Sequence, residues 1–233
     1  MALLGTIVNG IAIIAGSLLG LIFRNVSDKT KDTVLQGIGL SVIILGVGMG
    51  LKSQEFLIVI GSLAVGSALG EWWNLEEKLN ELGAWIERRV GAKEKGGIAR
   101  GFVTATLVYV IGAMAIIGAL DSGLRHDHTV LYTKSMLDGI SAIIFTSALG
   151  IGVAFSAVPV FIYQGLIALG AAFIQDVVPK ELMNSIIVEL TATGGVLITA
   201  IGLNMIKVTA IRVANMLPSL LFTIIITVIV HHV

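Results

Sequence analysis

The sequence predicts an all-α fold, a polytopic membrane bundle of about eight transmembrane helices with one further amphipathic helix. Hydrophobic residues make up 56% of the 233 residues, charged residues make up 13%, and mean hydropathy is +0.98. A soluble domain carries about twice that share of charge. The longest uncharged run covers 139–175, nearly twice the ~20 residues that one spanning helix needs. Pro159 lies near its middle, so the run predicts two helices joined by an uncharged hairpin.

Charged residues and helix breakers divide the chain into eight apolar segments. The expected spans are 2–23, 33–51, 56–71, 98–120, 134–155, 159–175, 183–206 and 211–230. The third is short, so a tilted, re-entrant or thinned-membrane arrangement stays open for it. The first basic residue, Arg24, follows the first apolar stretch, so that stretch is expected to be a retained helix and not a signal peptide.

The segment between the third and fourth spans is too charged to cross a bilayer. Apolar residues recur there at helical spacing, namely at Trp72, Leu75, Leu79, Leu82 and Ile86. Asn74 with Glu77 predicts a capping box at its start, and Gly91 predicts its end. This amphipathic helix is expected either to lie at the membrane interface or to pack on the cytoplasmic face of its own protein.

Basic residues in the loops predict the orientation, because cytoplasmic loops carry an excess of Lys and Arg. With eight spans, one side carries Arg24, Lys29, Lys31, Lys78, Arg88, Arg89, Lys93, Lys95, Arg100, Lys207 and Arg212. The other side carries only Lys52, Arg125, Lys134 and Lys180. Both termini are therefore expected outside the cytoplasm. Seven spans would separate the largest basic loop from the pair at 207–212, so the bias favours eight.

Two stretches of the chain resemble each other at a constant offset of 102 residues. Segments 34–38 and 136–140 each open a span, and both continue to a Gly-x-Gly, at 48–50 and 150–152. In the eight-span topology these two helices start from opposite sides, as in transporters built on inverted repeats. Chance similarity between glycine-rich helices is the alternative. A weaker third copy begins around 187–189.

The repeat predicts one transmembrane domain, 1–233, with internal divisions. They are a first repeat half (1–71), a cytoplasmic amphipathic helix and linker (72–97), an inverted second half (98–175) and a C-terminal helix pair (176–233). Glycine pairs four residues apart occur at 16/20, 46/50 and 66/70. Such pairs serve close helix packing within one chain or between two copies, so a homodimer is one option.

Several segments carry a family resemblance that covers essentially the whole chain. They are Gly-Thr-Ile-Val-Asn at 5–9, Gly-Ala-Met-Ala-Ile-Ile-Gly at 112–118, Asp-Gly-Ile at 138–140, Tyr-Gln-Gly at 163–165, Gly-Gly at 194–195 and Gly-Leu-Asn at 202–204. Through them the chain resembles the uncharacterised bacterial inner-membrane proteins of the YdfK/YqgA type (domain of unknown function 554). The resemblance implies a multi-pass protein of the bacterial cytoplasmic membrane, and it implies no established activity.

Two carboxylates fall within the expected spans, Asp138 and Glu189. An acid at that depth costs about 2–3 kcal/mol on an insertion scale, so each is a candidate functional group. Lys134 precedes Asp138 by one turn, which makes an interfacial ion pair the alternative for Asp138. Glu189 has no such neighbour. Its helix face continues with Thr193 and Asn204, which suits either a cavity lining or helix packing.

The carboxamides in the other spans belong to Asn9, Gln36, Gln164 and Asn215. Each alone is more often architectural, but together they indicate a hydrophilic centre. Tandem glycine at 194–195 weakens its helix by roughly 2 kcal/mol, which predicts a helix break unless the glycines serve close packing. Pro218 cannot donate to the carbonyl of Ala214, which is therefore expected to be open to water, a hydroxyl or an ion.

Other classes of function find little support. Zero net charge gives no indication of a nucleic-acid partner, and the chain has no cysteine. His126 and His128 share a loop with Asp121 and Asp127, but His-x-His alone is a weak metal signal, so no metal or cofactor is predicted. The sequence contains no recognisable nucleophile motif, phosphate loop or serine–histidine pairing, so an enzyme is not expected.

The sequence therefore predicts a secondary transporter or channel-like permease for a small solute or ion, with proton or cation coupling as one option. Glu189 is the expected proton or cation site and Asp138 its partner. The expected lining residues are Asn9, Gln36, Gln164, Thr193, Asn204 and Asn215. The alternative is a non-transporting membrane protein that acts as an assembly or regulatory partner. That alternative predicts a dry interior in which every polar group is paired.

Overall fold

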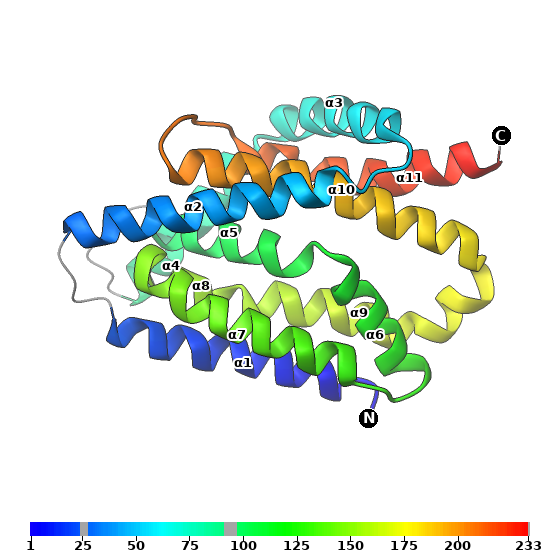
Figure 1. Cartoon of the computed structure of the whole chain (residues 1–233), viewed down its shortest axis with the longest axis horizontal. Helices are drawn as coiled ribbons and strands as arrows, with labels where there is room; N and C mark the ends of the chain where they lie inside the picture. The colour runs from blue at the N-terminus through cyan, green and yellow to red at the C-terminus, as the bar shows by residue number, and fades with distance from the viewer. Residues whose placement is uncertain (24–27, 91–96, 233) are drawn as a thin grey trace. The chain divides into compact units, whose positions relative to one another are not determined.

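The computed structural model describes residues 1–23, 28–90 and 97–232 (Figure 1). All regular structure in these ranges is helical, which confirms the all-α class. The helices are α1 (Leu4–Ile22), α2 (Asp28–Gly50), α3 (Phe56–Trp73), α4 (Leu75–Val90), α5 (Gly97–Val110), α6 (Ala113–Leu124), α7 (Thr129–Leu149), α8 (Gly152–Phe155), α9 (Ala157–Val177), α10 (Lys180–Met205), the 3-10 helix η1 (Val213–Met216) and α11 (Pro218–His232).

Six helical segments of the described chain are long and apolar enough to cross a membrane. They are Leu4–Ile22, Asp32–Gly50, Phe56–Trp73, Gly152–Val177, Lys180–Met205 and Val213–His231. A seventh results if the bent pair α5 and α6 counts as one span. The 21-residue α7, which carries Lys134 and Asp138, is not among them. A polytopic helical membrane protein is thus confirmed, while the count of eight spans and the inverted repeat stay predictions.

The chain divides into two compact units, each built from two separate stretches. Unit 1 comprises Met1–Lys31 and Asn80–Val177, and unit 2 comprises Asp32–Leu79 and Val178–Val233. These units do not follow the repeat halves expected from the sequence, because α1 packs against α7 and α9. The halves and their inverted relation are a matter of sequence similarity, and they stay predictions.

Within unit 1, α1 and α7 pack along their lengths through small residues (Figure 1). A Cβ atom at Gly20 would lie 2.5 Å from the carbonyl oxygen of Ile143, and one at Gly16 would collide with the carbonyl of Gly139. The contacts advance in the same direction on both helices, so the two helices are parallel. Backbone contact this close explains why glycine occurs at 16 and 20.

Two breaks in unit 1 differ from the sequence expectation. The single span expected at 98–120 is bent by 63° between α5 and α6, where Gly112 has φ +145°. The hairpin expected at Pro159 forms earlier, because α7 ends at Gly150 with φ +83°. Pro159 itself lies in the first turn of α9, where its missing N–H has no intrahelical acceptor to lose.

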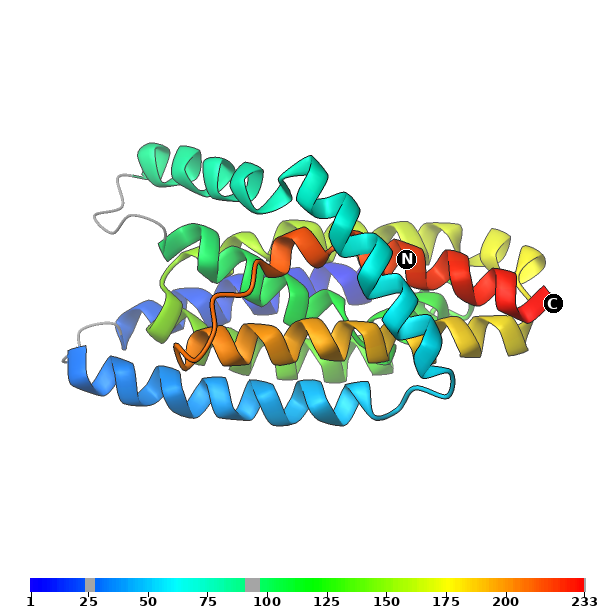
Figure 2. The ribbon, with the colours of Figure 1, turned by 90° about the horizontal axis from the view of Figure 1, so that it is seen from above.

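Within unit 2, α2 and α10 run antiparallel and lie side by side in Figures 1 and 2. A Cβ at Gly195 would lie 2.5 Å from the amide nitrogen of Gly50 and 2.6 Å from the carbonyl oxygen of Gly46. Of the two alternatives for 194–195, close packing is the one found, because α10 is continuous and Gly195 admits a neighbouring backbone. The α3 glycines at 66 and 70 face Ser219 and Asn215 in the same way. All three glycine pairs thus pack within their own unit.

The expectation for Pro218 is wrong. Pro218 is the first residue of α11, and the 3-10 helix η1 precedes it. The amide of Leu217 donates to the carbonyl of Ala214 at 3.2 Å, so that carbonyl has a partner. Proline at the first position of a helix removes no intrahelical bond.

The amphipathic helix is present as α4, but it does not begin with the predicted capping box. Asn74 adopts a left-handed conformation (φ +53°) that ends α3, and its N–H donates to the carbonyl of Glu71 at 3.1 Å. Its side-chain amide donates to the Glu77 carboxylate in place of the backbone bonds of a capping box. Gly91 lies outside the described residues.

Candidate functional site

Unit 1 holds a buried ion pair on α7. Lys134 Nζ lies 2.9 Å from Asp138 Oδ1 and 2.8 Å from Oδ2. Both residues are buried, at 7% and 5% exposure. From α1, Asn9 Nδ2 donates to Asp138 Oδ2 at 3.0 Å. The close glycine contact between α1 and α7 brings these side chains together, and the two opposite charges neutralise each other.

Gln164 on α9 joins this cluster. Its Oε1 accepts from Asn9 Nδ2 at 3.3 Å, and Asn9 and Gln164 are both fully buried. The carboxylate determines how both amides are oriented. If the amide of Asn9 were flipped, its oxygen would face the Asp138 carboxylate and repel it, so Nδ2 faces Asp138. Nδ2 also faces Gln164, and Gln164 therefore turns its oxygen toward Asn9. Each amide therefore keeps one end for another partner.

The remaining end of each amide has no protein partner. Among the described residues, neither Asn9 Oδ1 nor Gln164 Nε2 makes a hydrogen bond, although both atoms are buried. A buried amide group without a partner costs roughly 1–3 kcal/mol. The pair thus presents one free acceptor and one free donor, which can bind a polar guest.

Open space adjoins these side chains on α1. Gly10 is buried, yet a Cβ atom built there would meet no atom within 4 Å. Gly16 and Gly20 on the same helix have no such room. This open space at Gly10, called the void below, adjoins the residue next to Asn9 in the chain.

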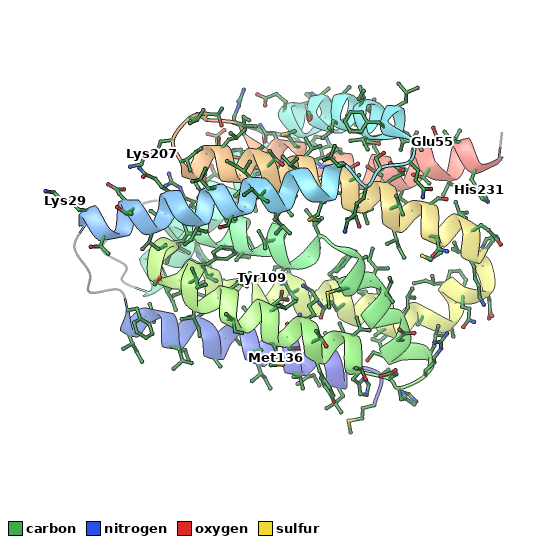
Figure 3. All side chains as sticks on the ribbon, viewed as in Figure 1. Lys29, Glu55, Tyr109, Met136, Lys207 and His231 are labelled. Carbon is green, nitrogen blue, oxygen red and sulfur yellow. The ribbon has the colours of Figure 1, made fainter. Side chains whose placement is uncertain are left out.

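The break between α5 and α6 faces the same part of α7. Tyr109, which is labelled in Figure 3, lies near the end of α5. Its ring stacks on Phe145 with ring centroids 6.1 Å apart. Its hydroxyl lies 3.5 Å from Ser141 Oγ, which shares its proton between the carbonyls of Leu137 at 2.8 Å and Asp138 at 3.0 Å. Helix ends leave backbone groups without intrahelical partners, so this break adds polar backbone to unit 1.

Glu189 in unit 2 has three protein donors. Its carboxylate accepts from Ser53 Oγ at 2.6 Å and from the backbone amides of Gln54 and Glu55 at 2.8 and 3.0 Å. These donors belong to the turn before α3, whose first amides have no intrahelical acceptor. Glu189 thereby joins α10 to the start of α3. Its role as a proton or cation site stays a prediction, and the geometry favours a structural role.

The other predicted residues of unit 2 do not meet at one site. Asn204 accepts from Thr209 Oγ1 at 2.8 Å and from the Ile211 amide at 2.9 Å, and so holds the loop after α10. Asn215 accepts from the Glu76 amide at 2.7 Å and donates to the Glu71 carboxylate at 2.6 Å. Thr193 pairs with Thr223, and Gln36 is exposed. These contacts are typical of structural residues.

A serine–histidine contact exists that the sequence analysis missed. Ser122 Oγ lies 2.7 Å from His128 Nδ1 and donates to the carbonyl of Ala2 at 2.7 Å. The hydroxyl has one proton, so it accepts from His128. An activated serine nucleophile requires the reverse, a histidine that accepts the hydroxyl proton. The contact therefore secures the chain terminus on the loop between α6 and α7.

The weak metal candidates His126 and His128 lie in that loop. Within the described ranges, no group of three or more His, Cys, Asp or Glu side chains is placed to hold a metal ion. His128 Nδ1 is used by Ser122.

Membrane-length apolar helices and a buried polar cluster define this chain as a polytopic helical membrane protein. Residues 4–228 match the family described as "Protein of unknown function (DUF554)", and the chain belongs to that family, which confirms the resemblance found in the sequence. Asn9, Asp138 and Gln164 each lie in a segment on which that resemblance rests.

Two relatives are similar over nearly the whole chain. The "Uncharacterized membrane protein YdfK" of Bacillus subtilis (strain 168) is 35% identical over 232 residues, which cover 97% of this chain and 96% of the relative. The "Uncharacterized protein YqgA" of Escherichia coli (strain K12) is 27% identical over 225 residues, which cover 94% and 93%. No solved structure matches the chain.

Proposed function

We propose that this protein is a permease, a secondary transporter or channel-like protein that moves a small solute or ion, with its binding site at Asn9, Asp138 and Gln164. The observation that carries the proposal is the pair of buried amide ends without a protein partner. A chain that only has to fold gains nothing from leaving a donor and an acceptor unpaired in its interior. A chain that binds a passing solute needs them.

Two features of unit 1 support a pathway to this site. The void at Gly10 gives a guest room beside Asn9. The bend between α5 and α6 adds non-helical backbone to the same unit, and such backbone is tolerated at membrane depth where it is buried in protein or lines a cavity. Transporters place substrate sites at discontinuous helices of this kind.

The rival interpretation, a non-transporting assembly or regulatory partner, predicts that every buried polar group is paired. In the part of the chain that the structure describes, seven buried side-chain atoms have no partner. Two of them, in Thr6 and Ser17, lie on the buried face of α1 that also carries Asn9. Unpaired groups in this number do not fit the fully paired interior that the rival interpretation predicts.

The proposal keeps the location expected from the sequence, a bacterial cytoplasmic membrane with both termini outside. The membrane relative in Bacillus subtilis and the bias of basic residues support this location. The proposal assigns no catalytic step to the protein.

Water accessibility tests the proposal directly, because the chain has no natural cysteine. Gly10→Cys places a thiol in the void, and we expect a charged, membrane-impermeant thiol reagent to modify it in intact membranes. Ala119→Cys, at a fully buried position on α6, serves as the matched control and is expected to stay unmodified. If Gly10→Cys is as unreactive as the control, no aqueous path reaches the site and the proposal is wrong.

Flux of solute then tests the role of the site. Gln164→Leu removes the free donor and is expected to abolish transport, whereas Glu189→Gln is expected to leave it intact if Glu189 is structural. Loss of flux and of its pH dependence in Glu189→Gln alone would instead support the role predicted for Glu189 from the sequence.

A further inference from the structure

The site in unit 1 combines two features that together define a class of guest. The charges within it cancel, and its two free atoms are of opposite hydrogen-bonding type. We infer that the solute is small and uncharged and carries both a hydrogen-bond donor and an acceptor, as urea, a primary carboxamide or a small polyol does. This inference rests on the proposed function and narrows it from "small solute or ion".

The electrostatic balance of the site argues against an ionic guest. Lys134 and Asp138 neutralise each other at 2.8–2.9 Å. The helices that complete the cluster add little charge, since α1 has no charged residue and α9 has only Asp176, in its last turn. A net-neutral site offers no charge to offset the desolvation of an ion.

The free atoms argue the same way. Asn9 Nδ2 donates to both Asp138 and Gln164, so the donors of Asn9 are used and its Oδ1 remains as an acceptor. Gln164 has its oxygen engaged and its Nε2 remains as a donor. A bare cation would find one free carbonyl oxygen and one NH₂ group. Hard cations require several oxygen ligands, so the free atoms do not suit a cation. A guest with one N–H or O–H and one C=O or hydroxyl oxygen satisfies both atoms.

Gly10 offers a position from which the open space on α1 can be tested. Gly10 leaves room on the α1 face, while Gly16 and Gly20 bring α1 into backbone contact with α7 farther along. A side chain added at Gly10 therefore enters the void without meeting neighbouring atoms at its Cβ. This position allows the void to be filled without changing any polar atom.

Proteoliposomes containing the full chain test the inference. The probes are urea, acetamide and glycerol, followed by stopped-flow light scattering, and K⁺, Na⁺ and Cl⁻, followed by ion-selective dyes. We expect at least one of the three uncharged solutes to cross at least tenfold faster than in protein-free liposomes, and none of the ions to do so. Gln164→Leu is expected to reduce the solute flux at least tenfold. Gln175→Leu, the same change at an exposed position of α9, is expected to leave it unchanged.

A second variant covers the case in which Gln164→Leu fails to fold. Gly10→Val fills the void and keeps all polar atoms, and it is expected to lower the flux at least tenfold while the melting temperature is retained. A flux that survives both folded variants overturns the inference.

The outcomes separate this inference from the proposed function. Absence of urea, acetamide and glycerol flux overturns the inference, whatever the ions do. If ions then cross and Gln164→Leu stops them, the proposed permease stands with an ionic guest. If nothing crosses and Gly10→Cys is not labelled, the proposed function fails as well.

Discussion

Replacing Lys134 by methionine is expected to destabilise the protein by about 3–5 kcal/mol, because it leaves the Asp138 carboxylate buried without its counter-ion. The two residues are at most 7% exposed, so solvent cannot compensate for the lost charge. Among the described residues, the carboxylate would keep a single side-chain donor, Asn9 Nδ2 at 3.0 Å.

The reverse change, Asp138→Leu, leaves the ammonium group of Lys134 buried and unpaired, and a similar loss is expected. The double variant Lys134→Met/Asp138→Leu removes both charges together. Apolar residues of similar volume often replace a buried ion pair without loss of stability. If each single variant loses about 3–5 kcal/mol and the double variant almost nothing, the coupling energy is the sum of the two single losses, about 6–10 kcal/mol.

Thermal unfolding of the purified protein in detergent measures these differences. For a chain of this length, 1 kcal/mol corresponds to about 2–4 °C, so each single variant should melt about 6–20 °C below the wild type. The double variant should recover most of that difference. If its loss instead equals the sum of the two single losses, the residues are not coupled, and the argument for a neutral site is refuted.

Two further predictions concern helix packing and pH. Gly46→Ala is expected to lower the free energy of unfolding by about 1–3 kcal/mol, because its Cβ would lie 2.5 Å from the Thr199 amide nitrogen. Gly48→Ala on the same helix meets nothing within 4 Å and should stabilise α2 slightly. Equal melting temperatures of the two variants would contradict this packing. The amide and hydroxyl of Thr129 hold the pKa of Asp127 below its usual value. The ionised Asp127 therefore stabilises the start of α7 at pH values above the ordinary pKa of an aspartate. This stabilisation is lost as the pH falls through the lower pKa that Asp127 has in the folded protein. Hydrogen exchange over 127–133, corrected for intrinsic rates, should rise between pH 6 and pH 3 in the wild type more than in Asp127→Asn, and an equal rise would exclude the effect.

The sequence predicts the helical membrane class and the main helices well. The third span, expected at 56–71, is α3 at Phe56–Trp73, and the seventh, expected at 183–206, is α10 at Lys180–Met205. The ends of these helices can be predicted because a spanning helix needs about 20 consecutive apolar residues. Charged residues and helix breakers mark where each apolar run ends.

The sequence also shows which spans carry polar residues, but it does not show the partners of those residues. It places Glu189 first because no base lies one turn away, and the structure adds three donors from the turn at 51–55. It groups Asn9, Asp138 and Gln164 with Glu189 along one path, and only the fold shows that these three residues bond to one another without Glu189. Their hydrogen bonds join residues 129 and 155 positions apart, which local pattern does not encode.

Glycine shows the same division between sequence and structure most clearly. Local propensity predicts a break at 194–195 and none at Gly112, and the structure has the opposite. At Gly195 the backbone of α2 packs against α10 and the helix stays continuous, while Gly112 takes a positive φ and α5 bends into α6. The sequence by itself determined which segments are apolar enough to enter a membrane and which residues in them are polar. Tertiary packing decided which helices break and which polar groups find partners, because both depend on the neighbour that each face meets.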